Sequence, residues 1–325
     1  MATSSETSDQ SAFKQQRLPA WQPILTAGTV LPTFFVIGIA FIPVGIGLLY
    51  FSDEVIIDYT DCIKYDSPEN KTCAVFIKES NMEPCTCQIE FNLTEDFKGH
   101  VYFYYGLSNY YQNHRRYVKS RDDSQLLGHL SSDVSLDCEP FASNNGVPIA
   151  PCGAIANSLF NDTLSVYSYE VPGPVPVLNT NIAWQSDRDI KFRNPQGDLK
   201  TVHAEQVYLL FIPQNEDLIV WMRTAALPTF RKLYRRVNHD DTNFKPGLIK
   251  GSYLLTVEYN YPVADFNGNK TFIISTTSLL GGKNPFLGVA YVVVGTLCLV
   301  LGIVLLVIHV RCSKSTSGCE DPNNT

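Results

Sequence analysis

The stretch that decides the fold is FLGVAYVVVGTLCLVLGIVLLVI, Phe286–Ile308, which carries no charged residue. A second uncharged apolar stretch, Ile24–Phe51, lies near the other end of the chain. A helix rises ~1.5 Å per residue, so each stretch is long enough to cross a hydrocarbon core of ~30 Å. We therefore predict a two-pass membrane protein whose large polar segment lies on one side of the membrane.

Five segments are expected along the 325 residues: a cytosolic N-terminal segment 1–23, a transmembrane helix 24–51, a lumenal glycosylated ectodomain 52–284, a second transmembrane helix 285–309, and a cytosolic tail 310–325. A cleaved signal peptide is the rival interpretation of the first span, but its apolar region would be only ~7–15 residues long. Pro32 and Pro43 fall inside this span. They predict a bend, which either belongs to a simple anchor or fits a partner helix.

Charge and glycan signals give the orientation. Lys14 and Arg17 precede the first span, and Arg311 and Lys314 follow the second. The positive-inside rule therefore places both termini in the cytosol. The middle segment holds four Asn-x-Ser/Thr sequons, which are glycan acceptors if this segment is lumenal: Asn70, Asn92, Asn161 and Asn269. A further sequon at Asn323 falls in the tail and is expected to stay unmodified.

Six of the nine cysteines lie in the middle segment, an even number that suits an oxidising compartment. Cys138 and Cys152 flank a turn-rich loop, and their pairing would stabilise the fold by roughly 3 kcal/mol. Cys85 and Cys87 are too close to pair with each other. Two arrangements remain open: Cys62–Cys85 with Cys73–Cys87, or Cys62–Cys87 with Cys73–Cys85. A zinc site is less favoured, because the cysteine spacing is wrong and no histidine stands at a complementary offset.

The ectodomain is predicted to be rich in β-strands. Runs of Val, Ile, Tyr, Phe and Thr indicate strands at Val101–Tyr105, Gln206–Ile212, Leu218–Trp221, Ser252–Tyr261 and Thr271–Ser278. Asn267-Gly268 between the last two indicates a hairpin. The proline-rich Val171–Pro176 is expected to be a loop.

Two segments have helical periodicity. Apolar and aromatic residues recur at three- and four-residue spacing in Leu107–Arg121, and again after Pro228 from Phe230 to Val237. Basic residues then fall on the opposite faces, where they are either solvated or meet an acidic partner or lipid headgroups. They are Arg115, Arg116 and Lys119 in the first segment, and Arg231, Lys232, Arg235 and Arg236 in the second.

No catalytic or cofactor motif stands out in the sequence. The chain lacks an Asp-Lys-Thr-Gly phosphorylation motif, a Gly-x-x-x-x-Gly-Lys phosphate loop and a Gly-x-Ser-x-Gly elbow. The net charge of −7 argues against nucleic-acid binding. The six histidines have no metal-binding spacing. We therefore expect a non-enzymatic protein with no cofactor, no metal and no nucleic-acid partner.

Five runs carry a resemblance to a known family: Phe13–Pro23, Tyr105–Tyr117, Ile149–Ser158, Trp221–Pro228 and Gly281–Phe286. In this order they resemble the cell cycle control protein 50 family, the accessory β-subunits of P-type phospholipid flippases. The resemblance implies two transmembrane helices, cytosolic termini and an ectodomain built around an antiparallel β-sandwich. It further implies a partner, the catalytic α-subunit of the flippase, whose folding and exit from the endoplasmic reticulum the chain would support.

The resemblance also implies particular site residues. It selects the nested disulfides Cys62–Cys87 and Cys73–Cys85 together with Cys138–Cys152, and it favours glycans at Asn161 and Asn92 over Asn70 and Asn269. The residues assigned to the partner interface are Phe13, Arg17, Trp21, Arg115, Arg116, Arg223, Lys283 and Asn284. Residues 167–194 and 196–206 depart from the better-known members, so the particular ATPase is left open.

The resemblance places the protein in the secretory pathway, from the endoplasmic reticulum through the Golgi to the plasma membrane. Two other classes of protein share part of this pattern. A two-span ligand-gated channel shares the layout, but the second span offers only Thr296 and Cys298 as polar lining. A membrane-tethered lumenal hydrolase lacks any nucleophile or paired-acid motif.

Overall fold

The computed structural model describes residues 26–50, 54–65, 70–80, 83–130, 133–194, 215–278, 281–282 and 285–316. The chain divides into two compact units. One contains both apolar stretches, in Met1–Ser52 and Asn284–Thr325, and the other is Asp53–Lys283. This second unit is the ectodomain.

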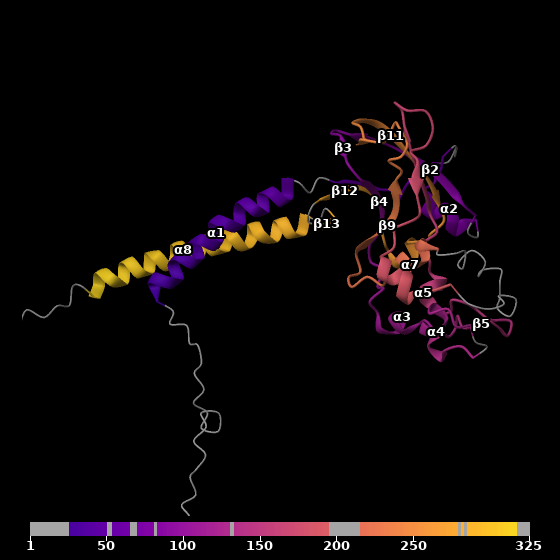
Figure 1. Ribbon diagram of the computed structural model, residues 1–325, viewed down its shortest axis with the longest axis horizontal. Helices are drawn as coiled ribbons and strands as arrows, with labels where there is room; N and C mark the ends of the chain where they lie inside the picture. The colour runs from indigo at the N-terminus through magenta and orange to yellow at the C-terminus, as the bar shows by residue number, and fades with distance from the viewer. Residues whose placement is uncertain are drawn as a thin grey trace, which may run out of the picture. The chain divides into compact units, whose positions relative to one another are not determined.

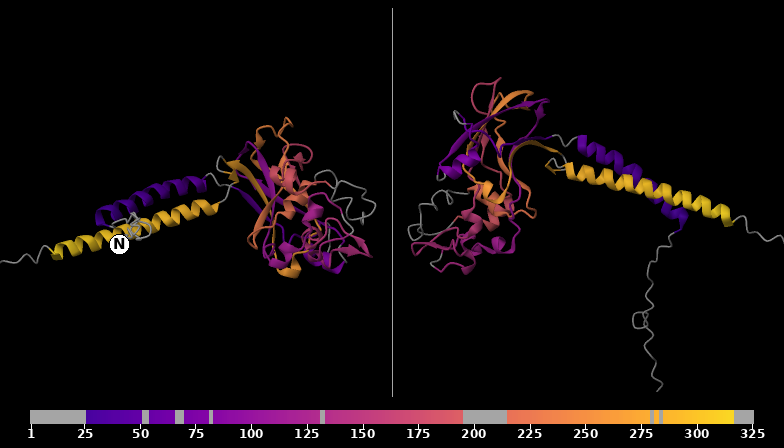
Figure 2. Two further views of the ribbon diagram at one scale, coloured as in Figure 1. Left: turned by 60° about the horizontal axis from the view of Figure 1, so that its bottom comes forward. Right: turned by 180° about the vertical axis from the view of Figure 1, so that it is seen from behind.

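The first unit is a pair of long helices, α1 (Ala27–Tyr50) and α8 (Pro285–Thr316). Both are long and apolar enough to cross a membrane. They lie side by side and run in opposite directions, which all views agree on (Figures 1 and 2). Glycines allow the close approach: a Cβ added at Gly45 would lie 2.9 Å from the backbone nitrogen of Val292, and one at Gly295 would lie 3.2 Å from that of Ile42.

The ectodomain is built on two antiparallel sheets. The first has the strand order β1-β12-β4-β9-β8, with β13 paired to β12. Its strands are β1 (Val55–Asp58), β12 (Lys270–Ser278), β4 (Val101–Leu107), β9 (Phe230–Val237), β8 (Val177–Leu178) and β13 (Gly281–Gly282). The second sheet has the order β2-β11-β7. Its strands are β2 (Cys85–Leu93), β11 (Gly251–Tyr259) and β7 (Thr163–Ser168).

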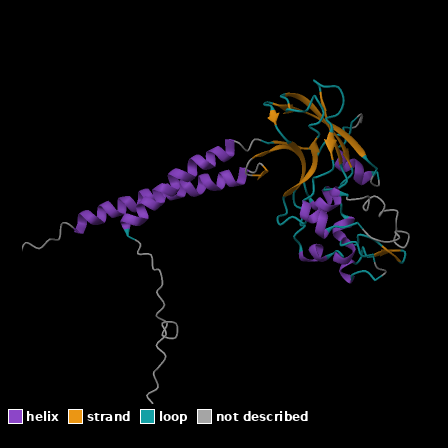
Figure 3. Ribbon diagram, in the orientation of Figure 1, coloured by secondary structure: helices purple, strands orange, loops and turns teal. Residues whose placement is uncertain are grey.

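Shorter elements complete the ectodomain. Two small two-stranded ladders pair β3 (Phe97–Lys98) with β10 (Gly247–Leu248), and β5 (Ser143–Asn144) with β6 (Val147–Pro148). The helices are α2 (Cys73–Glu79), α3 (Arg115–Lys119), α4 (Asp123–Leu126), η1 (Leu136–Cys138), α5 (Ala154–Asn157), the π-helical turn η2 (Asp187–Lys191), α7 (Glu216–Met222) and η4 (Ala264–Phe266). Figure 3 shows that α3, α4, α5 and α7 gather at one end of the ectodomain, with β5 beside them (Figure 1), and that the strands of the two main sheets lie towards the other end.

The core lies between the two sheets, as the alternation of side chains along each strand dictates. In β11 every second side chain is buried: Tyr253, Leu255, Val257 and Tyr259. From the first sheet they meet the buried side chains Phe103, Tyr105, Phe272 and Ile274 in a single cluster. The Tyr234 hydroxyl of β9 accepts a hydrogen bond from the Leu164 backbone N–H of β7 at 3.1 Å, which also joins the sheets. The expected antiparallel β-sandwich is therefore confirmed.

Three disulfides tie the ectodomain together in the nested arrangement. Cys62–Cys87 and Cys73–Cys85 join β2 to the segment before it, and Cys138–Cys152 joins η1 to the loop before α5. The sulfurs of Cys62, Cys73 and Cys87 lie within 4.8 Å of one another. All three belong to disulfides, so they offer no thiolate to a metal ion.

The strands predicted at Val101–Tyr105, Ser252–Tyr261 and Thr271–Ser278 are confirmed to within two residues as β4, β11 and β12. The strand predicted at Gln206–Ile212 lies outside the described residues. The strand predicted at Leu218–Trp221 is wrong, because these residues belong to α7. The Asn215 side chain accepts hydrogen bonds from the backbone N–H groups of Asp217 and Leu218, and this N-cap starts the helix.

The helix predicted after Pro228 is also wrong, because Phe230–Val237 form β9 between β4 and β8. Cross-strand pairing outweighs the helical spacing of its aromatic residues. Of the helix predicted over Leu107–Arg121, only Arg115–Lys119 is helical. Leu107 ends β4, and Asn109 takes a left-handed backbone with φ +57°, which stops regular structure there.

The predicted hairpin at Asn267-Gly268 is wrong as well. Asn267 does turn the chain, with φ +50°. The two flanking strands, however, belong to different sheets: β11 pairs with β2 and β7, whereas β12 pairs with β1 and β4. The turn therefore carries the chain from one layer of the sandwich to the other.

Candidate partner-binding surface

Three of the runs that carry the resemblance come together in the ectodomain. The indole Nε1 of Trp221 donates to the Ile155 carbonyl at 2.8 Å. The Gln112 side chain accepts from the Ala225 backbone N–H at 2.9 Å. The Asn113 side chain donates to the Ala226 carbonyl at 2.8 Å. Segments distant in sequence, 105–117, 149–158 and 221–228, thus form one hydrogen-bonded unit.

An aromatic cluster fills the centre of this unit. The rings of Tyr105 and Phe160 stack with centroids 4.0 Å apart. Trp221 is fully buried, and its ring lies 5.8 Å from that of Tyr110 and 6.1 Å from that of Tyr261. Such contacts contribute about 0.5–1.5 kcal/mol each beyond burial. The aromatic residues of these runs therefore have a structural role.

A buried lysine closes the C-terminal end of α7. The Nζ of Lys232, on β9, donates to the carbonyls of Val220, Trp221 and Arg223 at 2.9, 2.9 and 2.6 Å. Carbonyls at a helix C-terminus lack intrahelical donors and attract a cation. Burial, together with the smaller effect of the nearby Arg223 charge, lowers the pKa of Lys232 to about 7.

The other basic residues of β9 all have partners, and two of them form ion pairs. Arg231 pairs with Glu54 at 2.5 Å, and Arg235 pairs with Asp217 at 2.5 Å. The Nε of Arg236 donates to the Thr180 carbonyl at 2.7 Å. The free basic face that helical periodicity predicted for this segment is therefore absent from β9.

Arg223, which was assigned to the partner interface, lies on the surface. Its guanidinium donates to Asp187 Oδ2 at 2.9 Å and stacks over the ring of Trp184, 4.6 Å from the centroid. Burial opposes ionisation of the Asp187 carboxyl, but Lys191 and Arg223 together hold its pKa below the ordinary value. Trp184 itself remains 67% exposed.

Arg115 and Arg116 differ from the arginines of β9. Both are exposed at the start of α3, and neither forms an ion pair among the residues that the structure describes. Two apolar side chains on the adjoining turns are also exposed, Tyr111 by 57% and Leu227 by 68%. The bonds from Gln112 and Asn113 to residues 225 and 226 bring the two segments together. We name the exposed residues of these segments the Arg115 surface: Tyr111, Arg115, Arg116, Arg223 and Leu227. Exposed cations beside exposed apolar groups are typical of a protein interface.

The remaining residues assigned to the interface, Phe13, Arg17, Trp21, Lys283 and Asn284, lie outside the described residues. The four sequon asparagines are described, and all of them are exposed: Asn70, Asn92, Asn161 and Asn269. In two sequons the central residue is instead fully buried, namely Asp162 and Lys270. Sequence reasoning missed this pair and Lys232, because nothing local marks a charged residue as buried.

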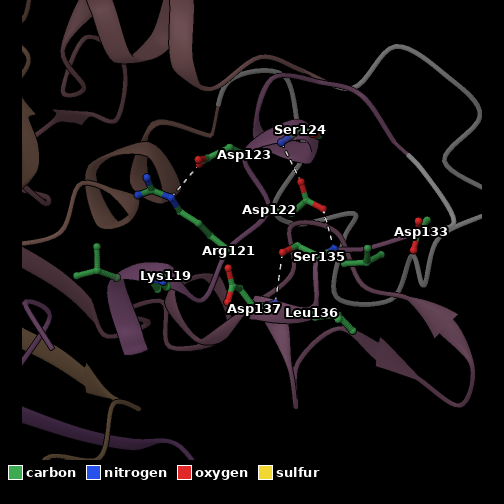
Figure 4. Close-up of a pocket in the computed structure, with 11 residues that line it drawn as sticks. Lys119, Arg121, Asp122, Asp123, Ser124, Asp133, Ser135, Leu136 and Asp137 are labelled. Carbon is green, nitrogen blue, oxygen red and sulfur yellow. Dashed lines mark hydrogen bonds and ion pairs between the residues drawn. The ribbon is translucent and has the colours of Figure 1, made fainter. Parts of the chain in front are cut away.

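A polar hollow of about 730 Å³ lies beside α3 and α4 (Figure 4). Two of the carboxylates that line it have structural partners. Asp122 accepts from the backbone N–H groups of Ser124 and Ser135 at 2.8 and 3.1 Å, and Asp123 pairs with Arg121 at 2.8 Å. Asp122 therefore caps α4 and holds the loop that contains Ser135. These contacts give the hollow a role in loop structure.

The two apolar spans and the disulfide-linked β-sandwich define a two-span membrane protein with a large ectodomain. The family described as LEM3 (ligand-effect modulator 3) family / CDC50 family matches residues 48–315. Cell cycle control protein 50A of Mus musculus is 51% identical over 96% of this chain and 92% of its own length. Cell cycle control protein 50B of Homo sapiens is 46% identical over 93% of both. ALA-interacting subunit 3 of Arabidopsis thaliana is 42% identical over 92% of this chain and 85% of its own length. The chain belongs to the LEM3/CDC50 family.

Proposed function

We propose that this chain is the non-catalytic accessory subunit of a phospholipid-translocating P-type ATPase, and that it supports folding of the ATPase, its exit from the endoplasmic reticulum and lipid transport. Family membership supports this proposal, as does the name of the plant relative, an interacting subunit. The partner is then the catalytic α-subunit, and the spans contact membrane lipids. Both termini are cytosolic, and the ectodomain is lumenal or extracellular.

The observation that carries the proposal is the Arg115 surface. The three runs that fold into one unit bury Tyr105 and Trp221 yet leave Tyr111 and Leu227 exposed, and Arg115 and Arg116 are exposed without an ion pair among the described residues. Adjacent exposed arginines next to exposed apolar side chains suit an acidic partner surface. An acidic loop of the ATPase on the lumenal side would pair with these arginines and fix the register of the complex.

The test is co-purification. The tagged chain is expressed in cells and extracted in mild detergent, and the retained P-type ATPase is quantified by mass spectrometry. Arg115→Ala/Arg116→Ala is expected to reduce retention about tenfold, which corresponds to ~1.4 kcal/mol. The matched control is Lys245→Ala/Lys250→Ala, which removes the same charge at two other exposed sites. An equal loss of ATPase retention in the lysine control would show that only net charge matters. Undiminished retention by Arg115→Ala/Arg116→Ala would show that the Arg115 surface is not part of the interface.

A further inference from the structure

One face of α1 packs against α8 and the opposite face does not. A Cβ added at Gly38 would lie 2.5 Å from the Leu299 side chain, and one at Gly45 would lie 2.9 Å from the Gly288 carbonyl oxygen. The backbones therefore touch along this line, and both glycines are buried. We name it the glycine seam; it consists of Gly38 and Gly45 on α1 with Gly288 and Gly295 on α8.

The outer face of α1 carries both prolines. Pro32, Val36, Ile39 and Pro43 follow one another at spacings of four, three and four residues, which places them on one stripe of a helix. All four are exposed, Val36 by 66% and Ile39 by 65%. We name this stripe the proline face.

Each proline leaves one backbone carbonyl without its donor. In an α-helix the N–H of residue i donates to the carbonyl of residue i−4, and proline has no N–H. Pro32 therefore frees the carbonyl of Gly28, and Pro43 frees that of Ile39. Gly28 lies in the first turn of α1, where lipid headgroups and water can donate a hydrogen bond to its carbonyl.

Ile39 is different because of its depth. It lies midway along α1 (Ala27–Tyr50), about 18 Å from either end at ~1.5 Å per residue. That places its carbonyl near the middle of a hydrocarbon core ~30 Å thick, where lipid offers no donor. An unsatisfied backbone group there costs several kcal/mol.

Among the described residues, no side chain donates a hydrogen bond to this carbonyl. The hydroxyl of Thr33 donates to the Thr29 carbonyl at 2.7 Å, and that of Thr296 donates to the Val292 carbonyl at 2.7 Å. Both hydroxyls are thus satisfied within their own helices. Between Gly38 and Tyr50, α1 has no Ser, Thr, Asn or Gln.

We infer that the proline face is the docking site for a transmembrane helix of a partner, and that a hydroxyl or carboxamide side chain of this helix donates a hydrogen bond to the Ile39 carbonyl. Val36 and Pro43 supply the apolar contacts on either side. In lipid such helices associate by close packing and hydrogen bonds, so a donor at this depth also sets the axial register. The identity of the partner, the P-type ATPase, rests on the function proposed above.

The first measurement is retention of the ATPase by Pro43→Ala. Alanine restores an N–H to residue 43, which then satisfies the Ile39 carbonyl within α1 and removes the acceptor that the partner uses. Interhelical hydrogen bonds in membranes average a modest strength, so retention is expected to fall about threefold. The matched control is Gly47→Ala, which also stiffens α1; its added Cβ meets nothing within 4 Å. Retention by Pro43→Ala at the wild-type level would overturn the inference.

The second measurement does not need the partner to be identified. The full chain, in bilayers and labelled with ¹³C at its isoleucine carbonyls, is compared with the Pro43→Ala variant by infrared spectroscopy. The difference spectrum is expected to show a free carbonyl in the isolated wild-type chain, and this band is expected to shift to a hydrogen-bonded frequency in the complex. Absence of the free band would overturn the inference. If the wild-type chain retains no ATPase, the proposed function fails, while the infrared result still decides the state of the Ile39 carbonyl.

Discussion

The Nζ of Lys270 lies 2.6 Å from Oδ2 of Asp162, and both side chains are fully buried. Asp162 precedes β7 and Lys270 begins β12, so the ion pair joins the two sheets of the sandwich. Oδ1 of Asp162 accepts from the backbone N–H groups of Asn260 and Tyr261 at 2.7 and 2.6 Å. Every charged atom of the pair is thus compensated, which a buried pair requires.

Breaking this pair is expected to be costly. Asp162→Asn should destabilise the ectodomain by about 3–5 kcal/mol, because it leaves Lys270 buried without its anion. Burial lowers the pKa of Lys270 to about 8 even though Asp162 acts in the opposite direction. Thermal unfolding of the full chain in detergent measures the loss. Asp265→Asn is the control, since its ion pair with Lys78 at 3.5 Å is exposed and should not matter.

Lys232 is expected to make stability depend on pH. Burial lowers its folded pKa to about 7, whereas an unfolded lysine titrates near ~10.4. Between these two pKa values the unfolded chain binds more protons at this lysine than the folded chain does. Lys232 therefore makes the free energy of unfolding rise with pH, by up to about 1.4 kcal/mol per pH unit.

The comparison for Lys232 is the melting temperature of the wild type and of Lys232→Met at pH 6.5, 8 and 9. The variant loses the bonds to three carbonyls and should be less stable at every pH. The difference between the two proteins should widen as pH rises above 7. If the melting temperatures of the two proteins changed in parallel with pH, Lys232 would have an ordinary pKa in the folded chain. Lys270 is present in both proteins, so its titration cancels.

The two spans, the β-rich ectodomain and three strands were predictable from sequence, because long apolar runs and β-branched runs are local signals. The sequence did not predict that Phe230–Val237 form a strand. Its basic residues resemble the solvated face of a helix, yet Lys232 is buried on a strand because carbonyls from α7 surround it. That environment is assembled by tertiary contacts, which no local pattern encodes.

The candidate surface was predictable only in part. Arg115, Arg116 and Arg223 were expected at the interface and lie exposed, whereas Trp221 in the same run is buried. For α7 a usable signal was overlooked: Asn215-Glu216-Asp217 supplies an N-cap followed by two acidic residues, which favours a helix start. The hairpin prediction failed because Asn-Gly marks a turn and does not determine which strands pair.

The glycine seam should not tolerate larger side chains. Gly45→Leu is expected to separate α1 from α8, since its Cβ would lie 2.9 Å from backbone atoms of Gly288 and Val292. Cysteines introduced for Phe41 and Tyr291, whose ring centroids are 4.9 Å apart, report the contact by crosslinking. The expected yield is low in Gly45→Leu and unchanged in Gly47→Leu, because the Cβ at residue 47 meets nothing within 4 Å. Equal yields would contradict the close contact.

Glycan occupancy tests the orientation. Each of Asn70, Asn92, Asn161 and Asn269 is exposed, so each single change to Gln is expected to remove one step of the mobility shift that endoglycosidase treatment abolishes. Asn323→Gln serves as the control and should leave the shift unchanged. A shift that persists with all four changes present, or that depends on Asn323, would reverse the proposed topology.

The Cys138–Cys152 disulfide is expected to be needed for exit from the endoplasmic reticulum. It closes a loop with a sequence separation of 14, worth roughly 3 kcal/mol in the chain-entropy view. Cys138→Ser should therefore hold the chain, and any ATPase bound to it, in an early compartment with immature glycans. Cys298→Ser, at a free cysteine in α8, is the control. Normal glycan maturation of Cys138→Ser would show that the bridge is dispensable.

The glycines of the seam recur every seven residues, at 38 and 45 on α1 and at 288 and 295 on α8, and Gly302 continues the same spacing on α8. Seven residues fall about 20° short of two full turns of a 3.6-residue helix, so a repeat of seven favours a left-handed winding of the two spans. One inserted residue between Gly38 and Gly45 would rotate the remainder of α1 by about 100° and move one glycine out of contact. Insertions between the two glycines therefore keep both of them in contact best when they add seven residues, whereas residues added at the ends of a span leave the phase of the helix pair unchanged.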